Sequence, residues 1–149
     1  MIREFFAGIY ESVIYDAAYD TIFMHLFQDW GYVYFGLIFI VIPLIFSALF
    51  YFLYFWNPYS KWWHWLIWLL VCLIFVFGIT FGVANVEIFA SDNDALIHAL
   101  SDTGHSYYEF ASLLPFLYGI LNILFGLIVF LLFSWIFKQF SKLHGHIPI

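Results

Sequence analysis

Charged residues are scarce in this chain. Asp, Glu, Lys and Arg make up 9% of its 149 residues, whereas a soluble domain carries about 25%. Hydrophobic residues make up 66%, and 21 Phe, 11 Tyr and 7 Trp would leave aromatic patches on a surface exposed to water. Most of the surface must therefore face lipid, and we predict an integral membrane protein.

Basic residues and cysteine are rarer still. The net charge is -6, and the four basic residues are Arg3, Lys61, Lys138 and Lys142. Without a basic patch to neutralise phosphates, we expect no nucleic-acid binding. The one cysteine, Cys72, can form neither an intramolecular disulfide nor a paired-cysteine metal or redox motif, so we expect a small buried hydrophobic side chain.

Three apolar runs are long enough to cross a membrane. They cover residues 32–56, 62–84 and 113–136 and contain no Asp, Glu, Lys or Arg. Each exceeds the roughly 20 residues that a hydrocarbon core requires, and Trp or Tyr lies near an end of each. The short connection Asn57–Lys61 makes the first two runs an antiparallel hairpin. We predict an all-α integral membrane protein with three transmembrane helices in one domain, residues 1–149.

The first 30 residues do not form a span. Helical spacing aligns one apolar stripe, and Glu4, Glu11 and Tyr15 lie on the opposite side. The stripe consists of Ile2, Phe5, Phe6, Ile9, Val13 and Ala17. This pattern predicts an interfacial amphipathic helix or a helix packed against the spans, followed by a shorter helical piece over Thr21–Gln28.

The connection 85–112 is an acidic extramembrane loop with a short helix of its own. Ser91 with Asp94 resembles a capping box, and Gly104 is suited to end that helix. A second helix, starting with Ser106 and Glu109, is expected to lead into the third span.

Three spans place the N-terminal segment and loop 85–112 on one side of the membrane, with all ten carboxylates. Three of the four basic residues lie on the other side. The positive-inside rule then predicts a cytoplasmic tail, residues 137–149, and an external N-terminus. The Phe- and Tyr-rich, Lys-poor composition suits a bacterial or organellar inner membrane, and we expect a bacterial cytoplasmic (inner) membrane.

Few residues suggest metal binding, cofactor binding or catalysis. Asp94, His98 and Asp102 follow one another at helical spacing and are the candidates for binding a divalent metal. Such residues also form ordinary pairs on helix surfaces, and we predict no metal site. No span holds a histidine near its middle, so we predict no haem or other cofactor. No hydrolase-type nucleophile motif is present, and we predict that the protein is not an enzyme.

The spans do carry small residues at helix-packing intervals. Gly78 and Gly82 form a GxxxG motif, and Gly119, Asn122 and Gly126 share one face of the third span. Such faces let helices approach closely, either within the chain or between subunits.

Two functions fit these features. The preferred one is a structural or assembly subunit of a larger membrane complex, with the lipid bilayer and other subunits, or copies of itself, as partners. The alternative is an oligomeric ion channel with an anionic mouth, in which Asn122 faces the pore. Because three spans cannot enclose a pore, a channel would require a ring of chains.

Overall fold

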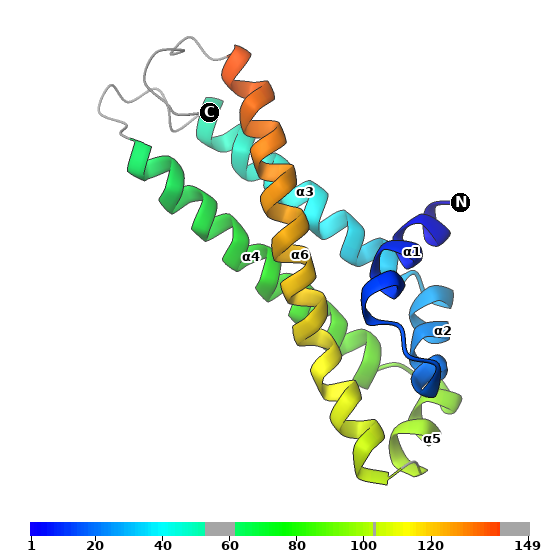
Figure 1. Cartoon of the computed structure of the whole chain (residues 1–149). Helices are drawn as coiled ribbons and strands as arrows, with labels where there is room; N and C mark the ends of the chain where they lie inside the picture. Colours follow the sequence, from blue (N-terminus) through cyan, green and yellow to red (C-terminus); the bar gives the residue numbers. More distant parts are fainter. Residues whose placement is uncertain (53–61, 103, 141–149) are drawn as a thin grey trace.

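The structure, a computed structural model, describes residues 1–52, 62–102 and 104–140. The described part consists of helices and their connections, and it contains no strand (Figure 1). In chain order the elements are α1 (Ile2–Ile14), the 3-10 helix η1 (Ala17–Tyr19), α2 (Asp20–Gln28), α3 (Gly31–Phe52), α4 (Trp62–Phe89), α5 (Asp94–Asp102) and α6 (Gly104–Phe140).

The prediction of an all-helical chain with three helices long and apolar enough to cross a membrane is confirmed. The qualifying helical segments are Gly31–Phe52, Trp63–Phe89 and Tyr107–Phe140. The end predicted for the first run and the turn after it lie outside the described residues. The helix of the second run continues past Ala84 to Phe89, which shortens the loop that was expected to begin at Asn85.

The long helices α3, α4 and α6 pack against one another and form the body of the molecule (Figure 1). Two glycines of α6 mark where α4 comes close. A Cβ at Gly119 would lie 2.7 Å from the Phe77 ring, and one at Gly126 would lie 3.5 Å from Val76 and 3.7 Å from Pro43. The absence of a side chain at these two glycines therefore lets the helices approach closely, as is common between membrane helices.

Helix α1 packs against the beginning of α3 (Figure 1). Its buried face consists of Phe6, Ala7 and Tyr10, and the Phe6 ring occupies the space that a side chain at Gly36 would need. The Arg3 guanidinium stacks 3.7 Å from the centre of the Trp30 ring. This cation–π contact ties the start of α1 to the connection between α2 and α3.

The side chains of the apolar stripe expected on this segment face in two directions. Phe6 turns into the bundle, whereas Ile2, Phe5 and Val13 are 61%, 64% and 63% exposed. The apolar arc of α1 is therefore wider than one contact surface, and its outer part faces away from the protein.

Helices α2 and α5 lie together at one end of the bundle (Figure 1). At 1.5 Å per residue, the 37 residues of α6 span about 55 Å, which exceeds a hydrocarbon core of about 30 Å. The 22 residues of α3 span only about 33 Å. At this end of the bundle α2 packs against α3, α4 and α5, and α5 packs against α6.

Candidate functional site

A fully buried side-chain amide lies at the centre of the bundle. Asn122 of α6 is 0% exposed and contacts all three neighbouring helices. Its Nδ2 donates to the Phe35 carbonyl of α3 at 3.0 Å and to Thr80 Oγ1 of α4 at 2.8 Å. Its Oδ1 accepts a hydrogen bond from the Tyr10 hydroxyl of α1. One side chain thus links the four helices α1, α3, α4 and α6.

The chemistry of the partners fixes the orientation of this amide. A backbone carbonyl can only accept, so the NH2 group of Asn122 must face Phe35. Its oxygen then faces Tyr10, whose hydroxyl must donate. Burial raises the pKa of the Tyr10 phenol, which keeps the hydroxyl protonated for this role. Both Asn122 protons are engaged within the chain, and this placement does not support a pore-lining role.

Aromatic rings enclose the Tyr10 side chain. It stacks on Tyr32 with ring centres 5.8 Å apart, and it meets Phe35 at 5.9 Å and Tyr118 at 5.6 Å edge-on. Edge-to-face and offset stacked pairs at such distances are favourable. These contacts hold the hydroxyl in position for Asn122.

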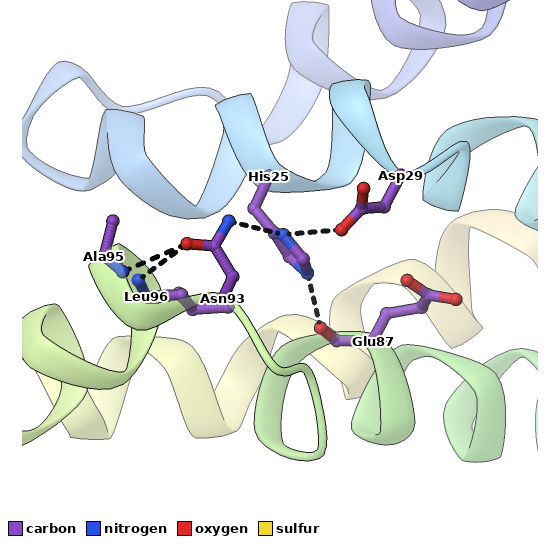
Figure 2. A network of polar contacts seen from close by, with 6 residues as sticks. All are labelled: His25, Asp29, Glu87, Asn93, Ala95 and Leu96. Carbon is purple, nitrogen blue, oxygen red and sulfur yellow. Dashed lines mark hydrogen bonds and ion pairs between the residues drawn. The ribbon is translucent and has the colours of Figure 1, made fainter.

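A second polar network lies at the end of the bundle, around the buried His25 of α2 (Figure 2). The imidazole Nε2 lies 2.9 Å from the Glu87 carbonyl of α4. Its Nδ1 lies 3.1 Å from Asn93 Nδ2 and 3.0 Å from a carboxylate oxygen of Asp29. The network therefore joins α2, the end of α4 and the start of α5.

Asn93 holds the network through the other end of its amide. Its Oδ1 accepts hydrogen bonds from the backbone N–H groups of Ala95 at 3.0 Å and Leu96 at 3.4 Å (Figure 2). This is an N-cap, which satisfies donors that the first turn of a helix leaves unpaired. The cap of α5 was expected at Ser91, and the structure assigns that role to Asn93.

An open cavity of about 550 Å³ lies beside this network. The side chains lining it include Asp29, Glu87, Asp92 and Asn93. Three carboxylates thus line the cavity beside the His25 network. They lie on the side of the molecule where the sequence predicts an anionic surface.

The small residues predicted for helix packing divide into two groups. Gly119, Asn122 and Gly126 lie at contacts within the chain, as described above. Gly78 and Gly82 are exposed, and a Cβ at either would have no neighbour within 4 Å among the residues that the structure describes. The GxxxG motif of α4 therefore faces outward.

The metal-ligand candidates do not form a described site. Asp94 and His98 lie on the exposed side of α5, and the side chain of Asp102 lies outside the described part. Among the described residues, no group of three or more His, Cys, Asp or Glu side chains is arranged to hold a metal ion.

Sequence reasoning did not select three residues of these networks: Tyr10, His25 and Asn93. The signals that could have found them are short-range. Tyr10 follows Phe6 by one helical turn, and His25 precedes Asp29 at the interval of a helix ion pair. Neither signal indicates which distant residue is the partner.

No protein-family model, curated protein or solved structure matches this chain.

Proposed function

We propose that this protein is a structural subunit of a membrane complex and that α4 provides the surface on which a partner helix packs. The observation that carries the proposal is the outward GxxxG motif, whose two glycines lie one helical turn apart and have no described residue within 4 Å of an added Cβ. Glycines at that spacing allow a second backbone to approach closely. In α6, by contrast, Gly119 and Gly126 already have α4 beside them.

A groove beside the motif extends this surface. It has a volume of about 700 Å³ and runs between α3 and α4. Its lining residues are Tyr34, Leu37, Ile38, Ile79, Gly82, Val83, Val86 and Glu87. The groove is apolar apart from Tyr34 and Glu87, so it suits an apolar transmembrane helix of another subunit.

The core supports a structural rather than a conducting role. Asn122 is engaged with α1, α3 and α4 and stiffens the bundle from within. A pore lined by Asn122 would require these contacts to break. The proposed role needs a stable scaffold and an open face, and the chain provides both.

The experiment compares matched bulky substitutions after extraction from native membranes with a mild detergent. Gly82→Leu should release the chain from its complex while changing its thermal unfolding little, because a Cβ at this position meets nothing within 4 Å in the described part of the chain. Leu132→Phe is the control. Leu132 lies on α6 and is 54% exposed, and its replacement should leave the complex intact.

Native mass spectrometry reports the outcome. A partner protein bound to the wild type and lost from Gly82→Leu supports the proposal, whereas a homo-oligomer would identify a second copy as the occupant. A wild-type chain that is monomeric in native membranes, or a Gly82→Leu variant that keeps its partner, would overturn it.

A further inference from the structure

We infer that His25 is a protonation-sensitive latch that holds the start of α5 against α2 and α4. The inference rests on one imidazole nitrogen that faces two competing partners. Nδ1 lies 3.1 Å from the Asn93 amide nitrogen and 3.0 Å from an Asp29 carboxylate oxygen. The first partner can only donate to Nδ1, and the second can only accept from it.

The other ring nitrogen fixes the neutral form. The Glu87 carbonyl accepts, so Nε2 must carry a proton at the 2.9 Å contact. In the neutral ring Nδ1 then has a lone pair, and it accepts from Asn93. This bond connects α2 to the residue that caps α5, and the latch is closed.

Protonation reverses the preference of Nδ1. The imidazolium carries N–H groups on both nitrogens, so Nδ1 donates to Asp29 and can no longer accept from Asn93. The NH2 group of Asn93 then faces an N–H group. Turning the Asn93 amide over would bring its oxygen to His25, but it would take that oxygen away from the Ala95 and Leu96 N–H groups that it caps. Asn93 cannot satisfy both sides, and the latch opens.

Three carboxylates lie near this network in the described part of the chain. Asp29 follows α2, Glu87 belongs to α4, and Asp92 lies in the connection to α5, and all three line the cavity beside the network. Among the described residues that line the cavity there is no Lys or Arg. Histidine is the side chain that changes charge between about pH 5 and 8, so acidification on this side of the membrane would loosen the contact between α5 and α2.

Hydrogen exchange of the full chain in lipid nanodiscs tests the latch, after correction for the intrinsic effect of pH on exchange. Protection of the Ala95 and Leu96 amides should fall about three- to tenfold from pH 7.5 to pH 5.5, the range expected for the loss of one hydrogen bond. The amides in the middle of α6 should show no such change. His25→Gln should abolish the pH dependence, because Gln has no proton to gain.

Two further variants keep the test decisive if His25→Gln fails to fold. Asn93→Asp keeps an oxygen for the α5 cap but offers Nδ1 a carboxylate, so protection at Ala95 should rise rather than fall on acidification. Asp29→Asn removes the acceptor of the protonated ring and should move the transition to lower pH. Asp92→Asn, which removes a carboxylate from the same cavity but none of the His25 contacts, is the matched control and should shift the transition less.

The inference is overturned if wild-type protection does not change between pH 7.5 and 5.5. It is also overturned if Asn93→Asp responds to acid in the same direction and size as the wild type.

Discussion

Replacing Asn122 by Leu tests the central contact of the bundle with little change in volume. The substitution removes the hydrogen bonds to α3 and α4, and it leaves the Tyr10 hydroxyl without its acceptor. Hydrogen bonds between membrane helices contribute about 0.6 kcal/mol each on average, and an orphaned buried hydroxyl costs about 1–3 kcal/mol. We therefore expect Asn122→Leu to lower the free energy of unfolding by about 2–4 kcal/mol.

A double-mutant cycle with Tyr10→Phe separates the hydrogen bond from packing. Tyr10→Phe alone should cost about 1 kcal/mol, since it removes one buried hydrogen bond and keeps the ring. In the double variant no hydroxyl is left unpaired. The losses of unfolding free energy in the two single variants should therefore sum to about 1–2 kcal/mol more than the loss in the double variant.

The assay is unfolding in bicelles by titration with a denaturing detergent, followed by Trp fluorescence. Tyr34→Phe is the control, because Tyr34 is 46% exposed and should change the unfolding free energy by less than about 0.5 kcal/mol. If Tyr10→Phe and Asn122→Leu add within about 0.3 kcal/mol, the contact between the two side chains does not exist and the reasoning fails.

Two further predictions concern the packing of α1 and the orientation of the chain in the membrane. Phe6→Ala should free α1 from α3 and expose it to added protease, because the Phe6 ring fills the space over Gly36. Phe5→Ala is the control and should leave α1 protected, because Phe5 is 64% exposed. Equal protection of α1 in both variants would contradict this packing. For topology, an impermeant maleimide added to intact cells should label Asp102→Cys and not His146→Cys, since the predicted orientation places the tail in the cytoplasm, and the reverse pattern would show that the orientation is inverted.

The sequence predicted the three long helices because their physical signal is local. Runs without charge that exceed the thickness of a hydrocarbon core can be recognised without knowledge of their neighbours. Helix ends were predicted less well, because the signals compete. Ser91 and Asn93 both stand before α5 and both could cap it, and only the path of the chain after α4 places the Asn93 oxygen at Ala95 and Leu96.

What a given residue contacts was decided by the tertiary structure. Gly78 and Gly119 carry the same packing signal, yet Gly119 has Phe77 against it, whereas no described residue lies within 4 Å of a Cβ at Gly78. Helical periodicity shows which residues share a face, but it does not show whether another helix covers that face.

Asn122 illustrates both sides of this limit. An amide in an apolar run predicts by itself that a partner must exist, because an unpaired polar group in hydrocarbon is costly. The identity of the partners depends on how four helices from distant parts of the chain meet, and no local pattern contains that information.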